Sequence, residues 1–244
     1  ATLVNNGLIN ATTPGAFLLL SQGAVTNTGT LAATGNATLL FLNGVALSNN
    51  VAGKLTGGTY VAIGAPAGGT NATLRLAAPA GTSATISNLA ATIRLTHVNG
   101  SLVAANAANI LVPLEISLAA IAGTGRLELL GDRNWTATTA LDVAGVLKVE
   151  GGTITQGGGI AVGAAGTIEG FGTIASQLAL EGVLHVAGGA MGLLGMSGGG
   201  TIDIDRGAEL RLPAGNFGQS FTGSGAVLAQ SGTVTPSGPL APDL

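Results

Sequence analysis

Apolar and polar residues alternate in short runs throughout the chain. Residues 147–149 read Leu-Lys-Val, 184–186 read Leu-His-Val, 202–204 read Ile-Asp-Ile and 210–212 read Leu-Arg-Leu. Because successive side chains of a strand point to opposite faces, each run predicts a short strand with one apolar and one solvated face. The runs end in pairs such as Gly-Gly, Asn-Gly and Asn-Asn, which are typical of turns.

A short unit that begins with glycine recurs along the whole sequence. The glycine is followed by one residue, usually small or polar, and then by an aliphatic residue. Successive copies are unevenly spaced, and the widest gap, from Gly53 to Gly100, equals two steps. The repeat unit is roughly 20–24 residues, which indicates a repeat architecture. The glycines of this unit are Gly7, Gly29, Gly53, Gly100, Gly125, Gly145, Gly166, Gly182 and Gly200.

Short strands at this spacing suit a sandwich, a propeller or a solenoid. The chain has 42 glycines but only 5 Phe, 1 Trp and 1 Tyr. A narrow core of Val, Ile, Leu and Ala with glycine at tight corners is typical of a parallel β-helix, whereas the other two folds need a wider, aromatic core. We therefore predict an all-β fold, a parallel β-helix or β-solenoid of roughly 10–12 coils, over residues 1–235, followed by an extended Pro-rich tail at 236–244.

Two stretches carry a resemblance to a known group of proteins. Residues 145–154 read Gly-Val-Leu-Lys-Val-Glu-Gly-Gly-Thr-Ile, and residues 165–174 read Ala-Gly-Thr-Ile-Glu-Gly-Phe-Gly-Thr-Ile. The sequence resembles the passenger domains of bacterial autotransporters and filamentous-haemagglutinin-like exoproteins, and 25–31 and 43–50 look like the same repeat. The resemblance implies a right-handed parallel β-helix exported to the bacterial cell surface, serving as an adhesin or stalk, and it implies no catalytic residues.

Charge and composition narrow the functional classes. Charged residues make up 8% of the chain, the net charge is −3, and cysteine is absent. Because so few basic residues cannot neutralise a phosphate backbone, we expect no nucleic-acid partner. The most apolar stretch, 110–121, is interrupted by Pro113, so we expect no membrane insertion. We also expect no cofactor.

One local cluster of carboxylates is a candidate for chemistry. Asp203 and Asp205 are two residues apart on one predicted strand, with Glu209 nearby. Paired carboxylates are the groups that a polysaccharide lyase or hydrolase needs. In a chain with few charges, however, a solvated strand face is the favoured interpretation, and we expect neither a catalytic nor a metal site. We likewise expect His97 and His185 to be solvated surface residues.

Other polar and aromatic residues admit a functional interpretation. Trp135 is expected to plug a coil or to pack under a loop rather than to bind a ligand. Asn-x-Ser/Thr sequons exceed the number expected by chance only mildly, and each is a candidate for glycosylation. The sequon residues are Asn10, Asn36, Asn71, Asn99 and Asn134.

The ends of a solenoid expose unpaired strand edges, and this leads to our functional prediction. We expect a secreted structural protein that stacks end to end with copies of itself into a surface fibre or extracellular matrix. One alternative is an adhesin stalk that binds a host or matrix ligand through 76–85 or 132–139, and a second is a polysaccharide-degrading enzyme. The expected assembly surfaces are Leu3, Val4, Pro236, Pro239, Leu240 and Pro242.

Overall fold

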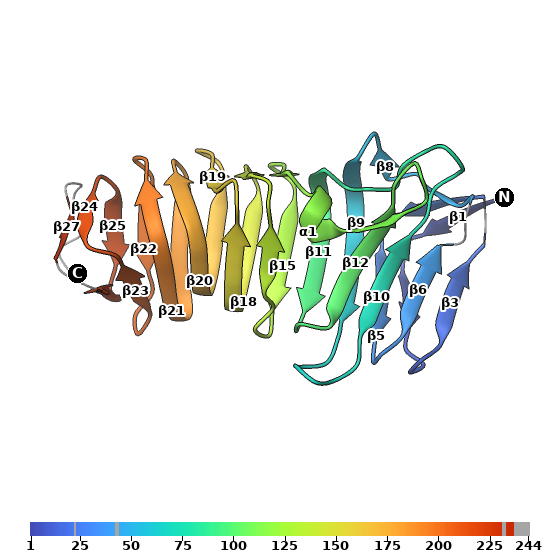
Figure 1. Ribbon diagram of the computed structural model, residues 1–244, viewed down its shortest axis with the longest axis horizontal. Helices are drawn as coiled ribbons and strands as arrows, with labels where there is room; N and C mark the ends of the chain where they lie inside the picture. Colours follow the sequence, from blue (N-terminus) through green and yellow to red (C-terminus); the bar gives the residue numbers. More distant parts are fainter. Residues whose placement is uncertain (22, 42–43, 231–232, 237–244) are drawn as a thin grey trace.

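The protein is an elongated all-β body in which strands lie side by side along the long axis. The computed structural model describes residues 1–21, 23–41, 44–230 and 233–236. The strands follow one another from β1 at one end to β27 at the other (Figure 1). Parallel pairing dominates, and the antiparallel pairs β12–β13 and β8–β9 are exceptions. The predicted all-β, parallel-strand class is thus confirmed.

The first strands of the chain fall into separate sheets. One sheet pairs β1 (Thr2–Asn5), β4 (Ala24–Asn27) and β7 (Ala46–Leu47). A second contains β3 (Phe17–Leu20), β6 (Thr38–Phe41), β10 (Ala72–Leu76), β12 (Gly100–Ala105) and β13 (Leu111–Pro113). Near the opposite end, β24 (Gly215–Phe217) pairs with β27 (Val234–Pro236).

The largest sheet runs the length of the molecule, and its pairings close on themselves. The ring closes because β11 pairs with both β14 and β15, and β20 pairs with both β18 and β19. The strands of this sheet are β2 (Leu8–Ala11), β5 (Thr30–Thr34), β8 (Asn50–Val51), β9 (Lys54–Ile63), β11 (Asn88–Thr96), β14 (Ala120–Ile121), β15 (Arg126–Leu130), β16 (Trp135–Ala137), β17 (Leu141–Val143), β18 (Val146–Gln156), β19 (Ile160–Val162), β20 (Thr167–Leu180), β21 (Val183–Ser197), β22 (Thr201–Ile204), β23 (Glu209–Leu212), β25 (Ser220–Gly223) and β26 (Ala226–Ala229).

An unbroken stack of apolar side chains fills the interior. Each member is paired in register with the next, so the same position of successive strands points inward. The first member is half-buried, and the others are at most 1% exposed. This core column comprises Ile9, Leu31, Tyr60, Ile93, Leu127, Leu147, Ile168, Leu184, Ile202 and Phe221.

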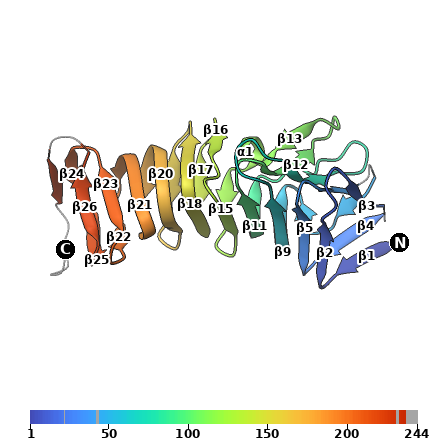
Figure 2. The same cartoon turned by 90° about the horizontal axis from the view of Figure 1, so that it is seen from below.

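The step between members of the core column varies more than the sequence repeat suggested. The shortest step joins Ile168 to Leu184, and the longest, from Ile93 to Leu127, is about twice as long. The long step contains β12, β13 and the one-turn helix α1 (Leu114–Ser117), which lies beside β12 and β13 (Figure 2). The expected repeat length therefore holds only for part of the chain, and the apolar stretch 110–121 contains one helical turn.

Several repeat glycines are required because two backbones come into contact. A Cβ on Gly166 would lie 2.0 Å from the carbonyl oxygen of Val143, and one on Gly145 would lie 2.2 Å from that of Ala122. Neither oxygen belongs to a flexible side chain, so neither can move aside cheaply. Glycine at these corners thus allows one layer of strands to approach the next.

An asparagine ladder supports the first layers from within. Asn5 Nδ2 donates to Asn27 Oδ1 at 2.7 Å, and Asn49 Oδ1 accepts from the Asn27 backbone N–H at 2.6 Å. The three asparagines are evenly spaced along the sequence. Asn5 and Asn27 are buried, so these bonds satisfy polar groups that water does not reach.

The domain boundary predicted at residue 235 falls within the last strand. Pro236, the first residue of the predicted tail, is paired with Phe217 in the β24–β27 sheet. The remainder of that tail, which includes Pro239, Leu240 and Pro242, lies outside the described residues.

The glycine contacts predict a sharp difference between two nearby substitutions. We expect Gly166→Ala to reduce the free energy of unfolding by about 1–3 kcal/mol or more, because its Cβ must push the Val143 carbonyl away. At Gly163 the nearest atom to a Cβ is 3.8 Å away, so Gly163→Ala is the matched control and should change stability little. Urea unfolding followed by circular dichroism measures both, and equal stability of the two variants would contradict this packing argument.

Candidate functional site on an outward charged ladder

Six ionisable residues in the middle of the chain share one outward register position. Each is paired in register with the next, on β11, β15, β18, β20, β21 and β22 in turn, and the sign of the charge alternates when the histidine is protonated. Adjacent strands are about 4.8 Å apart, so neighbours of opposite sign attract across each gap. This charged ladder comprises Arg94, Glu128, Lys148, Glu169, His185 and Asp203.

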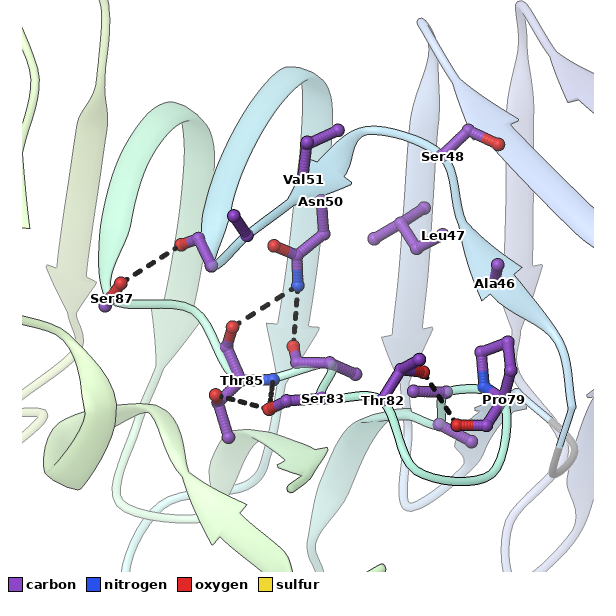
Figure 3. A pocket seen from close by; sticks show the side chains of 15 residues that line it. Ala46, Leu47, Ser48, Asn50, Val51, Pro79, Thr82, Ser83, Thr85 and Ser87 are labelled. Atoms are coloured by element: carbon purple, nitrogen blue, oxygen red, sulfur yellow. Dashed lines mark hydrogen bonds between the residues drawn. The ribbon is translucent and has the colours of Figure 1, made fainter. Parts of the chain in front are cut away.

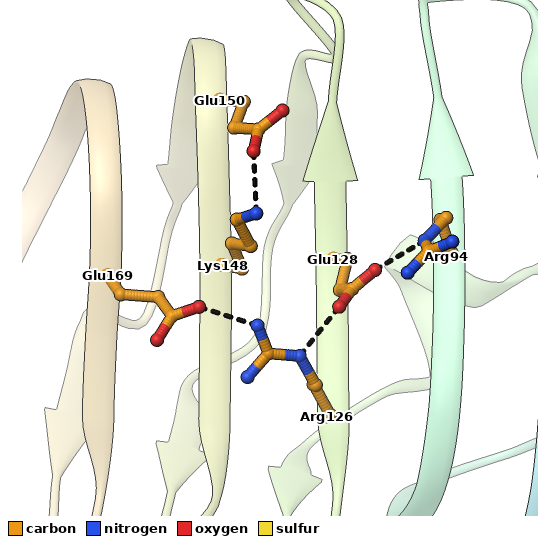
Figure 4. Close-up of polar contacts among 6 residues, drawn as sticks. All are labelled: Arg94, Arg126, Glu128, Lys148, Glu150 and Glu169. Atoms are coloured by element: carbon orange, nitrogen blue, oxygen red, sulfur yellow. Dashed lines mark hydrogen bonds and ion pairs between the residues drawn. The ribbon is translucent and has the colours of Figure 1, made fainter. Parts of the chain in front are cut away.

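Glu128 is the centre of the ladder's first half. Its Oε2 lies 2.5 Å from Arg94 Nε, and its Oε1 lies 2.6 Å from Arg126 Nε. Arg126 Nη2 also lies 2.5 Å from Glu169 Oε1, beyond the intervening strand. Lys148 Nζ lies 2.6 Å from Glu150 Oε1 on its own strand (Figure 4). The chain of ion pairs thus links several layers of strands.

Burial and charge act in opposite directions on Glu128. Its side chain is only 7% exposed, and this burial raises the pKa of the carboxyl group. The hydrogen bonds and charges of Arg94 and Arg126 outweigh burial and hold the pKa of Glu128 below its ordinary value. The carboxylate is therefore charged in the folded protein.

His185, Asp203 and Asp205 converge at the far end of the ladder. His185 Nε2 lies 3.0 Å from Asp205 Oδ1 and 3.9 Å from Asp203 Oδ2. The hydrogen bond to Asp205 raises the pKa of His185, and the charges of Asp205, Asp203 and Glu169 add to it against partial burial. Thr222 Oγ1 donates to the other oxygen of Asp203 at 3.0 Å.

The sequence identified only part of this cluster. It predicted Asp203, Asp205 and Glu209 together, but Glu209 lies on β23 and pairs with Arg211 instead. It also treated His185 as a solvated surface residue; the side chain is 35% exposed, but the fold places Asp205 alongside it. The signal was present in the sequence, since His185 and Asp203 occupy equivalent positions of consecutive repeat units.

His97 and Trp135 have structural partners. His97 has a positive φ of 58°, and its Nδ1 lies 2.9 Å from the carbonyl oxygen of Gly131. Trp135 is 1% exposed and donates its indole N–H to Gln156 Oε1 at 3.1 Å. Trp135 therefore packs in the interior, as the sequence predicted.

The sequon residues differ in how free their side chains are. Asn99 donates to the carbonyl oxygens of Ala65, Pro66 and Gly69 at 3.0–3.2 Å, so its amide is engaged in the loop. The other four sequon asparagines differ in burial and in hydrogen bonding. Asn10 and Asn36 are half-buried, Asn71 is exposed, and Asn134 accepts a backbone hydrogen bond from Thr153.

The predicted ligand loop at 76–85 lines a groove of about 640 Å³ (Figure 3). The opposite wall is formed by β7 and β8, and Asn50 Nδ2 donates to the carbonyl oxygen of Ala84 at 2.7 Å, which holds the two walls together. The lining is uncharged and rich in small side chains and hydroxyl groups. Its polar members are Ser48, Asn50, Thr82, Ser83, Thr85 and Ser87.

The second predicted ligand loop, at 132–139, is anchored to the body of the protein. Arg133 is 8% exposed, forms an ion pair with Glu115 and donates to the carbonyl oxygen of Val98. Together with the burial of Trp135, these contacts hold the loop close to the strands beneath it.

Comparison with family models, curated proteins and solved structures gives no match to this chain. Within the described ranges, no helix is both long and apolar enough to cross a membrane.

The charged ladder predicts an acid-sensitive contribution to stability. Replacing Glu128 by Gln removes the charge that two arginines share, so we expect the free energy of unfolding at pH 7 to fall by about 1–3 kcal/mol. Because the pKa of Glu128 is lowered by folding, its contribution is complete above the unfolded-state pKa and is lost as the pH falls through the folded-state pKa. Urea unfolding of wild type and variant should converge in acid.

Glu209→Gln is the matched control for this substitution. Its partner Arg211 has a side chain that is 54% exposed, so solvent screens the pair and we expect little change. Equal stability of wild type and the Glu128 variant at pH 7 would contradict the role assigned to the ladder.

Proposed function

We propose that the chain is a right-handed parallel β-helix with a structural role, a unit of an extracellular fibre or matrix on a bacterial surface. The order of strands supports a helical winding. β1, β2 and β3 lie in three different sheets, and β4, β5 and β6 return to those sheets in the same order. A chain that visits three faces in rotation winds around one axis, and crossovers between parallel strands are right-handed in nearly all proteins.

The observation that supports the structural role is an inward, core-type side chain that is left uncovered at one end. Leu18 is paired in register with Leu39, which in turn is paired with Leu74 and then Leu102. The last three are at most 1% exposed, whereas Leu18 is 38% exposed. Leu18 therefore occupies an inward position whose outer neighbour is missing from the described residues.

The backbone at this end is also available for pairing. β1 and β3 are the outer strands of their sheets. A strand edge with free N–H and C=O groups is a template for another strand, and main-chain hydrogen bonds supply the affinity. We propose that a second copy of the chain pairs with these strand edges. Its far end, with β25 and β26, also consists of parallel strands, so head-to-tail contact continues the ladder and generates a filament.

Secretion and a bacterial origin follow from the resemblance of residues 145–174 to surface-exposed passengers. The absence of cysteine and the 8% charged residues are compatible with this proposal. A surface with few charges also offers little repulsion to association.

A specific observation favours one alternative, an adhesin stalk that binds a host or matrix ligand. The groove along residues 76–85 has the volume of a small-ligand site, and its hydroxyl and amide groups suit an uncharged polar ligand. In that case the rod presents the groove, and end-to-end assembly is not needed for function.

Self-assembly is tested by light scattering and negative-stain electron microscopy of the full chain at several concentrations. We expect filaments whose length grows with concentration, because stacking buries the exposed core position. Leu18→Lys places a charge in the inward column and should abolish growth. Phe17→Lys, on the same strand but at an outward position that is 63% exposed, is the matched control. Monomers at every concentration would overturn self-assembly and leave the adhesin alternative.

A further inference from the structure

The cluster at the end of the charged ladder has the geometry of a metal site. The described residues include one group of three His, Cys, Asp or Glu side chains whose ligand atoms all lie within 4.8 Å of one another, namely His185, Asp203 and Asp205. Donors bound to one tetrahedral zinc ion at ordinary bond lengths are about 3.4 Å apart. The observed separations from His185 Nε2, 3.0 Å and 3.9 Å, lie on either side of this value.

The charges around the cluster favour a cation. Among the residues that the structure describes, the ion pairs of Asp203 and Asp205 are both with His185. The next carboxylate along the ladder, Glu169, is bound by Arg126, and Lys148 beyond it is bound to Glu150. One imidazole therefore serves two carboxylates. A metal ion on Nε2 releases the proton held there and supplies in its place the positive charge that faces the two carboxylates.

The orientation of Asp203 is fixed from outside the cluster. Thr222, on the following strand, donates its hydroxyl hydrogen to Asp203 Oδ1 and leaves Oδ2 directed at His185. A hydrogen bond that orients a ligand in this way is a regular feature of metal sites.

We propose that His185 Nε2, Asp203 Oδ2 and Asp205 Oδ1 bind one divalent transition-metal ion of the zinc class. Imidazole nitrogen favours zinc, copper, iron or nickel over calcium and magnesium, which prefer oxygen ligands alone. The three side chains are 35%, 45% and 53% exposed, so water or an external ligand completes the coordination. The ion ties β21 to β22 and stabilises the folded protein by mass action.

Zinc binding is measured by isothermal titration calorimetry at pH 7.5 on the full chain, purified without a polyhistidine tag. We expect one zinc ion per chain and binding at least tenfold weaker in His185→Gln and in Asp205→Asn. Calcium should not compete. His97→Asn and Glu209→Gln are the controls and should bind as wild type, because neither residue belongs to the cluster. Unchanged affinity in His185→Gln, or one-to-one binding of calcium, would overturn the proposal.

A second measurement locates the ion without depending on a variant. The chain has two histidines and no cysteine, so imidazole signals in a ¹⁵N–¹H spectrum are few and assignable with the two histidine variants. Substoichiometric Cu²⁺ should broaden the signals of His185 and leave those of His97 sharp. Equal broadening of both, or broadening of His97 alone, would show that the ion binds elsewhere and contradict the assignment.

Discussion

Each layer of strands must reproduce the position of the layer before it, and the rest of the structure depends on this constraint. In-register parallel pairing brings equivalent residues about 4.8 Å apart, so an inward position stays inward along the whole body. The core column satisfies this with aliphatic or aromatic side chains in every layer. Where two layers meet at a corner, the constraint becomes steric, because the backbone of Val143 occupies the space that a Cβ on Gly166 needs.

The same register organises the outer surface. Side chains that share an outward position are held next to each other whether or not they attract, so like charges in succession would destabilise the stack. The ladder from Arg94 to Asp203 alternates in sign, and Arg126 spans the Lys148 strand to reach Glu169. Few charges are present, and the ion pairs Arg94–Glu128 and Arg126–Glu169 join different strand layers. The convergence of His185 with two aspartates follows from the same geometry.

Alternation and the glycine repeat were sufficient to predict strands, parallel pairing and an apolar interior from the sequence. The pairing partners were harder to predict, because the longest step between layers is about twice the shortest. Arg126 and Glu169 lie on β15 and β20, and no local pattern joins them. In contrast, the even spacing of Asn5, Asn27 and Asn49 equals the early repeat, so this ladder could have been recognised. The Asp203–Asp205 pair is visible in the local sequence, whereas His185 joins it only through pairing between strands.

The two halves of the rod stabilise their register by different means, and this bears on the open end. In the early layers the register position that continues the charged ladder is uncharged, with Asn10, Ala32 and Val61 in succession and the last two buried. The buried asparagines Asn5 and Asn27 join these layers from within. From Arg94 onwards the polar contacts that join the layers lie on the outside instead, as ion pairs. The strands β1, β2 and β3 at this end carry no charged side chain, and the inward Leu18 is exposed. The association that we propose at this end would depend on apolar burial and backbone pairing, which salt does not screen.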